Sequence, residues 1–236
     1  MRVIVAPFAF NEGIKIQHTL QRIPRELGYD VMVVDDGSTD HSLDNVQEYG
    51  ATVLRNDRNL GIGASIRRYL SYALEHEYDI AVIMAGNNKD DPDEIPRLLH
   101  PIQNEGYDIV QGSRYLPGGD FGNMPFYRQL ATRYVHPLLM SLIAKREITD
   151  STNGFRAIRV SILKDRALNL HQDWLNKYEL EPYLMYKTIA LGYKFTEVPV
   201  TKIYPPKALG YTKMRPLTGW WSILRPLVLL GLRLKN

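Results

Sequence analysis

Four short polar segments in the first half of the chain hold the side chains best suited to bind a ligand. Each one follows a short apolar run, and together they span residues 7–12, 35–40, 85–91 and 112–115. Carboxylates and amides in the first three segments can accept hydrogen bonds from hydroxyl and N–H groups of a ligand. Arg114 in the fourth offers a planar fork that matches two phosphate oxygens. One Asp-Gly-Ser segment is usually only a turn, but four such segments after successive apolar runs favour a single ligand site.

Further candidates lie in the second half. Arg128 is in a helix-forming stretch and, like Arg114, offers a planar cation. Asp150 begins the segment Asp-Ser-Thr-Asn-Gly-Phe-Arg, and its carboxylate can accept hydrogen bonds. Lys213 and Arg215 form a basic cluster that can meet a phosphate group. Surface salt bridges for the arginines, helix capping for Asp150 and a solvated loop for the basic cluster are the alternatives.

The composition excludes several classes of protein. The 236 residues are 44% hydrophobic and 23% charged, which is ordinary for a globular protein. Cysteine is absent, which excludes a disulfide scaffold, a thiol nucleophile and cysteine-based zinc sites, and fits a reducing compartment. The net charge of +3 is too small to indicate nucleic-acid binding. The start of the chain lacks a signal-peptide pattern, and we expect a cytoplasmic protein.

Short apolar runs alternate with helical patterns along the chain. The runs at residues 3–6, 31–34, 52–54, 80–84 and 109–110 are bounded by Gly, Pro, Asp or Asn, which is typical of buried strands. Helical spacing of apolar residues covers residues 16–27 and 62–73, and Asp91-Pro92 predicts a third helix start. Residues 125–145 and 175–191 also have helical patterns, and a strand is expected at 193–199. The pattern predicts an α/β fold with a mostly parallel sheet and helices on both faces.

In such a sheet, ligands bind at the carboxyl ends of the strands. The four polar segments all fall at predicted strand ends. We therefore expect them to converge on one cleft.

The C-terminal segment differs from the rest, and we divide the chain into a domain of residues 1–203 and a tail of residues 204–236. A Trp pair, Trp220 and Trp221, begins an amphipathic stretch whose charges are all positive. Aromatics beside aliphatics and cations are typical of a helix that lies on a membrane surface. A helix docked on the core and an oligomer interface are the alternatives. Because no run of about 18 apolar residues occurs, no membrane-spanning helix is expected.

Several motifs resemble those of the family-2 glycosyltransferases with the GT-A fold, and among them the dolichyl- and polyprenyl-phosphate hexosyltransferases. The resemblance covers nearly the whole chain and is most specific in the block Val33-Val34-Asp35-Asp36-Gly37-Ser38-Thr39-Asp40. It also includes Pro7 with Asn11-Glu12, Asn59-Leu60-Gly61-Ile62-Gly63, Gly112-Ser113-Arg114-Tyr115, Arg128, Asp150-Ser151-Thr152-Asn153-Gly154-Phe155-Arg156 and Gly192-Tyr193 with Glu197-Val198-Pro199.

The resemblance implies an inverting transferase that moves a hexose from a GDP- or UDP-sugar to a polyprenyl or dolichyl phosphate, peripheral on the inner face of the membrane. It assigns Arg114 and Arg128 to phosphate groups and Asp150 to the acceptor. Lys213 and Arg215 would meet the acceptor phosphate, and either Glu179 or Glu181 matches the family pattern. The residues that it places around the nucleotide are Pro7, Phe10, Asn11, Glu12, Asp36, Gly61 and Asn87. Gly61 and Gly63 would let the backbone come close to the ligand.

Two alternatives to this activity remain open. An acceptor with a sugar or other hydroxyl group would need Asp150 as a general base, whereas a phosphate monoester is already anionic at neutral pH. A chain without catalysis could serve as a nucleotide-sugar-binding partner of another transferase.

The chain departs from the family where an Asp-x-Asp motif usually holds Mg²⁺ or Mn²⁺. Alignment through Asp91-Pro92 puts Ala85-Gly86-Asn87 in its place. A neutral amide is a weaker ligand for a hard cation than a carboxylate. An altered metal site of Asn87 with Asp90 or Asp91, replacement of the metal's charge by Lys89, Arg114 or Arg128, and binding without turnover are the three interpretations.

Overall fold

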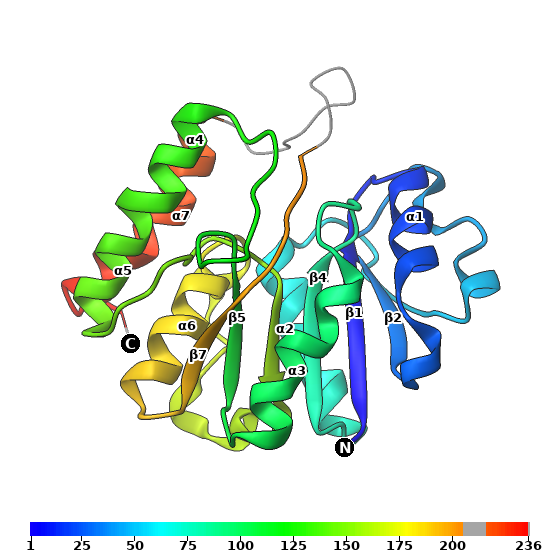
Figure 1. Ribbon diagram of the computed structural model, residues 1–236, viewed down its shortest axis with the longest axis horizontal. Coiled ribbons are helices and arrows are strands. Elements are labelled where there is room, and N and C mark those ends of the chain that lie inside the picture. Colours follow the sequence, from blue (N-terminus) through cyan, green and yellow to red (C-terminus); the bar gives the residue numbers. More distant parts are fainter. Residues whose placement is uncertain (205–215, 236) are drawn as a thin grey trace.

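The computed structural model describes residues 1–204 and 216–235. Its described part contains a seven-stranded sheet with the strand order β3-β2-β1-β4-β6-β5-β7 (Figure 1). The strands are β1 (Val3–Ala9), β2 (Asp30–Asp35), β3 (Thr52–Arg55), β4 (Ile80–Ala85), β5 (Ile109–Ser113), β6 (Arg156–Arg159) and β7 (Phe195–Pro199). All neighbouring pairs are parallel except those of β6, which runs antiparallel between β4 and β5.

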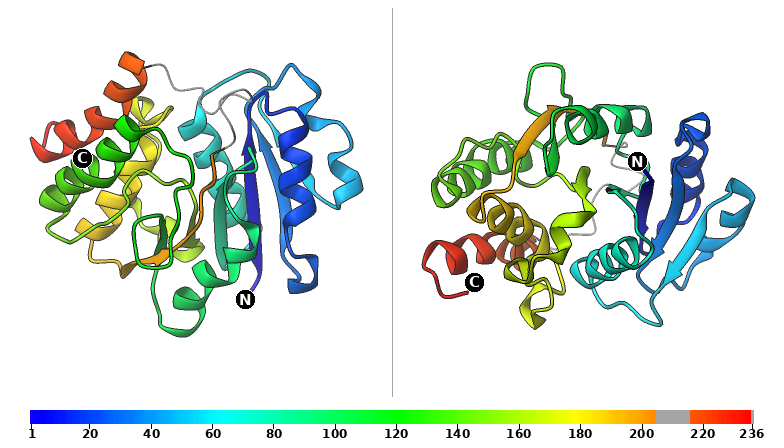
Figure 2. Two further views of the ribbon diagram at one scale, coloured as in Figure 1. Left: turned by 45° about the horizontal axis from the view of Figure 1, so that its top comes forward. Right: turned by 90° about the horizontal axis from the view of Figure 1, so that it is seen from below.

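Helices cover both faces of the sheet, as the two turned views in Figure 2 also show. The helices are α1 (Ile14–Arg22), α2 (Ile62–Glu75), α3 (Ile95–Asn104), α4 (Phe126–Leu130), α5 (His136–Ala144), α6 (Leu180–Ala190) and α7 (Pro216–Gly231). A π-helical turn, Ala131–Val135, joins α4 to α5. Alternate residues of β1 point to opposite faces: Ile4 joins a core with α2 and α6, and Val5 joins a core with α1 and α3. The predicted α/β architecture is confirmed.

Three details of the sequence prediction were wrong. The first helix ends at Arg22 rather than near Leu27, because Ile23 precedes Pro24 and takes an extended conformation. Strand β1 continues through Pro7 to Ala9, and its pairing with β2 passes from Val5 directly to Phe8, which accommodates the missing N–H of Pro7. Strand β6 was not predicted, because four residues with an arginine at each end carry no apolar run.

The C-terminal segment contains a helix that is docked on the core. Helix α7 packs against α5 and α6, and its Leu227 and Leu230 are buried. This is one of the alternatives considered for the tail. Lys213 and Arg215, expected at the acceptor phosphate, lie outside the described residues. Within the described ranges, the helices are all too short or too polar to cross a lipid bilayer.

Candidate functional site

The candidate site lies where the strand order of the sheet reverses. Strand β1 pairs with β2 on one side and with β4 on the other, so the loops that follow β1 and β4 diverge between them. Such a point at the carboxyl edge of a parallel sheet is where ligands bind. Because β6 is antiparallel, the residues before it lie at this same edge. Asp36, Asn87 and Arg114 therefore belong to one edge of the sheet, as predicted.

The loops after β1 and β2 are tied into one unit. The backbone N–H of Asn11 donates to Ser38 Oγ at 2.9 Å, and Asn11 Oδ1 accepts from the N–H of Thr39 at 2.9 Å. The backbone N–H of Glu12 donates to Ser42 Oγ at 2.7 Å. Asn11 has a left-handed backbone with φ of 51°. Asn11 and Glu12, which were predicted to hold a nucleoside, are thus held in place at this edge of the sheet.

Asp36 organises the next loop. Its Oδ1 accepts from Asn56 Nδ2 at 2.9 Å and from the N–H of Leu60 at 2.8 Å, and its Oδ2 accepts from the N–H of Gly61 at 2.9 Å. The side chain is buried. A carboxylate has about four acceptor positions, so three are used within the protein. A nucleoside contact by Asp36 stays a prediction.

Gly61 and Gly63 pack closely against the backbone of residues 175–177. A Cβ on Gly63 would lie 2.0 Å from the carbonyl oxygen of Leu175, and one on Gly61 would lie 2.4 Å from that of Asn176. Gly61 also has φ of 97°. Close packing against the backbone of the segment before α6 therefore explains both glycines. We had expected a bound ligand, rather than this segment, to approach their backbone.

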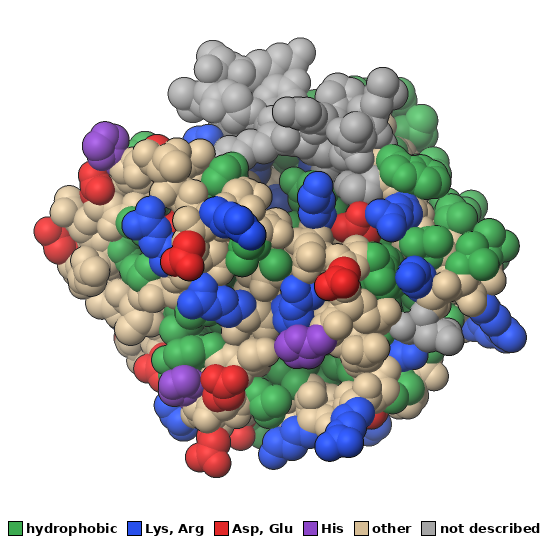
Figure 3. Space-filling view, turned by 180° about the vertical axis from the view of Figure 1, so that it is seen from behind, with side chains coloured by type: hydrophobic (Ala, Val, Ile, Leu, Met, Phe, Trp, Pro, Cys, Tyr) green, Lys and Arg blue, Asp and Glu red, His purple; other side chains and the backbone are tan. Residues whose placement is uncertain are grey.

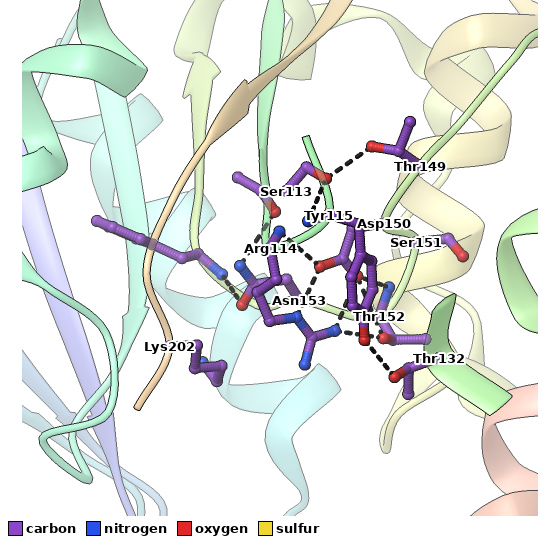
Figure 4. Close-up of polar contacts among 12 residues, drawn as sticks. Ser113, Arg114, Tyr115, Thr132, Thr149, Asp150, Ser151, Thr152, Asn153 and Lys202 are labelled. Carbon is purple, nitrogen blue, oxygen red and sulfur yellow. Dashed lines mark hydrogen bonds and ion pairs between the residues drawn. The ribbon is translucent and has the colours of Figure 1, made fainter. Parts of the chain in front are cut away.

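Arg114 and Asp150 form a buried ion pair (Figure 4). The guanidinium Nε lies 2.6 Å from Asp150 Oδ2 and Nη2 lies 2.8 Å from Oδ1, so the pair is bidentate. The backbone N–H of Arg114 donates to the same carboxylate at 3.1 Å, and Nη2 also donates to Thr152 Oγ1 at 2.7 Å. Both side chains are almost fully buried. The two residues had been predicted to contact donor and acceptor, and in the structure they contact each other.

The environment of Asp150 keeps it ionised. Burial alone would raise the pKa of this carboxyl, but the charge and hydrogen bonds of Arg114 hold its pKa below the usual value. Glu197 accepts from the N–H of Asp150 at 2.8 Å and from the N–H of Thr149 at 2.7 Å, which fixes the loop. No role was predicted for Glu197 beyond its place in a motif. Its partners lie almost fifty residues away in the chain, so no local pattern indicates them.

The segment after β4 has two carboxylates, and both already form hydrogen bonds and ion pairs within the protein. Asp90 Oδ2 accepts from the N–H of Ala85 at 2.8 Å, and its Oδ1 forms an ion pair with Lys202. Asp91 caps the helical turn before α3 and pairs with Arg22 at 2.6 Å. The predicted helix start at Asp91-Pro92 is confirmed, with Asp91 as its cap.

Two cationic side chains lie over the ring of Tyr204, beside the segment after β4. Lys89 Nζ lies 4.8 Å from the centre of its ring, and the Arg128 guanidinium lies 5.4 Å from it. Its hydroxyl accepts from Arg114 Nη1 at 3.4 Å. Burial, together with the charges of Lys202 and Arg128, lowers the pKa of Lys89 to about 8. Tyr204 itself is buried. Its role was not predicted, because a tyrosine ahead of two prolines reads as the start of a loop.

A small cavity adjoins Arg128. It has a volume of about 140 Å³ and lies between α4, α6 and α7. Arg156 at its wall pairs with Glu181 at 2.9 Å, whereas Glu179 lies 3.7 Å from Arg225. Glu181 lines this cavity, and which of the two glutamates matches the family pattern stays a prediction. A larger cavity of about 330 Å³ lies between α2 and residues 163–171, and its lining holds none of the predicted site residues.

Comparison with known proteins gives the family. Residues 5–167 match the family described as Glycosyl transferase family 2. The chain belongs to this family. An undecaprenyl-phosphate mannosyltransferase of Micrococcus luteus is 30% identical over 220 residues, which cover 91% of this chain and 88% of that protein. A dolichol-phosphate mannosyltransferase of Pyrococcus furiosus is 32% identical over 177 residues, which cover 72% of this chain and 49% of that protein.

A solved structure supports the fold of this glycosyltransferase. The crystal structure of glucosyl-3-phosphoglycerate synthase from Mycobacterium tuberculosis, in complex with Mn²⁺, UDP and glucosyl-3-phosphoglycerate, has a TM-score of 0.71 at 20% identity. The alignment covers 98% of this chain and 79% of that one. The match agrees with the predicted GT-A fold.

The residues of this glycosyltransferase do not fit a divalent cation at the position of the Asp-x-Asp motif. Mg²⁺ and Mn²⁺ prefer carboxylate oxygens, and Ala85 and Asn87 supply none. Asp90 is held by Lys202, and Asp91 is held by Arg22 and by its helix cap. The described residues contain no group of three or more His, Asp or Glu side chains that could hold a metal ion. The predicted pair of ligands, Asn87 and Asp91, is therefore not supported by the donor set.

Proposed function

We propose that this family-2 glycosyltransferase moves a hexose from a nucleotide sugar to the phosphate of a polyprenyl lipid. The bond between the anomeric carbon and the diphosphate breaks, and its electron pair stays on the nucleoside diphosphate. A phosphate oxygen of the acceptor forms the new bond from the opposite face, which inverts the configuration. The names of the two mannosyltransferase relatives support this acceptor class.

The state of Asp150 carries the proposal. A hydroxyl acceptor needs a base to take its proton, and a base must offer a lone pair at a useful pKa. Asp150 accepts five contacts, from Arg114 and Thr152, and its pKa is held below the usual value. A phosphate monoester is already ionised near pH 7, with a second pKa of about 6. The geometry therefore suits an acceptor that needs positioning rather than deprotonation.

Arg128 is the residue that we assign to the acceptor phosphate. It lies on α4 and lines the small cavity together with Thr152 and Arg156. Both arginines offer planar donor forks that match phosphate oxygens. We assign the direct phosphate contact to Arg128, because it lines this cavity from α4 and its charge lies close to that of Lys89.

An exposed apolar face beside the cavity suits a lipid acceptor. Figure 3 shows hydrophobic side chains gathered over α4, α5 and α7. The large apolar side chains exposed there, by 38% to 77%, are Phe126, Tyr127, Leu130, Tyr134, Val135, Leu138, Leu139, Leu142, Trp221, Val228, Leu232 and Leu234. Exposed cations lie among them, including Arg133, Lys145, Arg233 and Lys235. An apolar face with basic residues is typical of a surface that lies on anionic lipid. We assign this face to the membrane that holds the acceptor, on the cytoplasmic side.

The proposal is tested by comparing two acceptors that differ only in the phosphate. Labelled GDP- and UDP-hexoses are incubated with the protein and either a polyprenyl phosphate or the matching polyprenol. Transfer to the phosphate alone, with inversion of the anomeric centre in the product, is the expected result. Transfer to the free alcohol at a similar rate would contradict the proposal and would return Asp150 to the role of base.

A further inference from the structure

The segment after β4 places a lysine where the diphosphate of a donor has to bind. The geometry points to Lys89 as the residue whose ammonium binds that diphosphate, in place of a divalent cation. Donor binding by this chain would then need no metal. This inference rests on the proposed function, since it names the group that holds the donor of that reaction.

The first support is position. Lys89 follows β4, one of the two strands that flank the reversal of strand order. Glu12, which follows β1 on the other side, lies close enough to stabilise the charge of Lys89. The ammonium therefore lies between the two loops that diverge at the edge of the sheet. This is the place where the phosphate groups of a nucleotide bind in open α/β sheets.

The second support is the way in which the ammonium is held. Asn88 has a left-handed backbone with φ of 58°, and its N–H donates to Thr19 Oγ1 at 3.0 Å. The chain therefore turns sharply just before Lys89. The side chain is 9% exposed, and the backbone carbonyl of Lys89 accepts from the N–H of Ile203 at 2.9 Å. The ring of Tyr204 lies 4.8 Å from Nζ, within the range of a cation–π contact. A cation fixed in this way loses little freedom when it binds an anion.

The third support is the charge around the segment. Lys202 and Arg128 both repel the charge of Lys89, so positive charge is concentrated here. The charge of Lys202 is largely balanced by Asp90, with which it forms an ion pair, so Lys89 and Arg128 carry the remaining positive charge of this group. A divalent cation at the same point would be repelled by these two side chains, and in a partly buried site such repulsion is stronger than in water. An anionic diphosphate would be attracted by both.

The fourth support is the difference between residues 85–89 and the Asp-x-Asp motif of the family. Without the two acids of the Asp-x-Asp motif this segment lacks two negative charges, and Lys89 places a positive charge two residues after Asn87. An ammonium is a compact charge with three N–H donors, and lysine binds phosphate in this way in other folds. Without a metal ion, the ammonium can attract the diphosphate. It can also stabilise the negative charge that develops on the leaving group.

Nucleotide binding tests this inference independently of the acceptor. GDP and UDP are titrated into the full-length protein by calorimetry, once with excess EDTA and once with Mg²⁺ or Mn²⁺. One of the two nucleotides should bind with an affinity that changes less than about two-fold between these conditions. Lys89→Met keeps the length of the side chain and should weaken binding in EDTA by at least about ten-fold, or 1.4 kcal/mol. Lys89→Arg should retain most of the affinity, and Lys164→Met on the exposed segment after β6 should bind like the parent protein.

The outcomes are separable. Binding that appears only with added metal, or a Lys89→Met protein that binds as tightly as the parent in EDTA, would overturn the inference and leave the proposed function standing. Failure of both nucleotides to bind in either condition would overturn the proposed function and the inference together. The melting temperature of each variant shows whether it is folded. If Lys89→Met is unfolded, the EDTA comparison on the parent protein and on Lys89→Arg still decides.

Discussion

The guanidinium of Arg114 grips the carboxylate of Asp150 through two contacts of 2.6 and 2.8 Å, with both side chains almost fully buried. The pair joins the end of β5 to the loop before β6, two segments 36 residues apart. It shapes the edge of the sheet on which Arg128 and Tyr204 lie. Each residue is therefore a positioning residue, and the charge of Arg114 keeps the buried Asp150 ionised.

A double-mutant cycle tests the pairing. Arg114→Met leaves a buried carboxylate without its partner, and Asp150→Asn leaves a buried guanidinium without its partner. Each should lower the free energy of unfolding by about 3–5 kcal/mol. The double variant removes both charges, so its loss should be well below the sum of the two single losses. Urea unfolding measures all four proteins, and losses that simply add would show that the pair is not coupled.

Arg128→Ala should reduce turnover with a polyprenyl-phosphate acceptor by at least about ten-fold, because it removes the proposed phosphate contact. The side chain is half-buried on α4, so the fold should survive. Steady-state kinetics and the melting temperature are measured together. Arg166→Ala, an exposed arginine near the other end of β6, is the matched control and should be fully active. An Arg128→Ala protein with unchanged rates would remove Arg128 from the site.

The apolar face can be tested by introducing charge into it. Leu138 and Leu142 are 61% and 65% exposed on α5, so the double variant Leu138→Asp, Leu142→Asp should stay folded. It should lose binding to anionic vesicles in a flotation assay, because it places carboxylates against the lipid. Ile14→Asp, on α1 and 57% exposed in the parent, should bind like the parent. Undiminished flotation of the double variant would contradict the membrane contact. Deleting the tail is a poorer test, since Leu227 and Leu230 belong to the core.

His136 should make the protein less stable in mild acid. Its Nδ1 lies 2.6 Å from Ser151 Oγ and its Nε2 lies 3.3 Å from the carbonyl of Ile223 in α7. Burial lowers its pKa from 6.5 to about 4, although the contact with Ile223 opposes the shift. Above pH 6.5 the imidazole is neutral whether the chain is folded or unfolded. As the pH falls from 6.5 to 4, the unfolded chain takes up the proton first, so up to about 3 kcal/mol of stability is lost.

His136→Gln should flatten this part of the stability curve, as measured by urea unfolding between pH 4 and pH 7. His18→Gln, on the exposed side of α1, should leave the curve of the parent unchanged. A His136→Gln protein that loses stability as steeply as the parent over this range would show that other groups are responsible.

The edge of the sheet that carries the candidate residues could be predicted from the sequence, because it depends on local patterns. Apolar runs predict the parallel strands, and the polar segments after them predict that Asp36, Asn87 and Arg114 lie at one edge. The structure confirms that shared edge, and a single ligand cleft formed by these residues stays a prediction. The cap at Asp91 is equally local, since it accepts from an N–H two residues away.

The contacts within the site could not be read in the same way. Tyr204 meets Arg114 across 90 residues, and Glu197 meets Asp150 across 47. Both contacts depend on β7 lying next to β5, and on the antiparallel β6 bringing Asp150 to the same edge. Because β6 was not visible as an apolar run, the pairing of Arg114 with Asp150 was not predicted. The requirement for glycine at Gly63 likewise comes from a segment more than a hundred residues away.

The most direct test of the whole account is a crystal structure of the protein soaked with the nucleoside diphosphate that binds and a short-chain polyprenyl phosphate. The account predicts the diphosphate against Lys89 at the reversal between β1 and β4, and the acceptor phosphate within hydrogen-bonding distance of Arg128. A nucleotide bound away from that edge, or a lipid phosphate that contacts neither Arg128 nor its cavity, would contradict it.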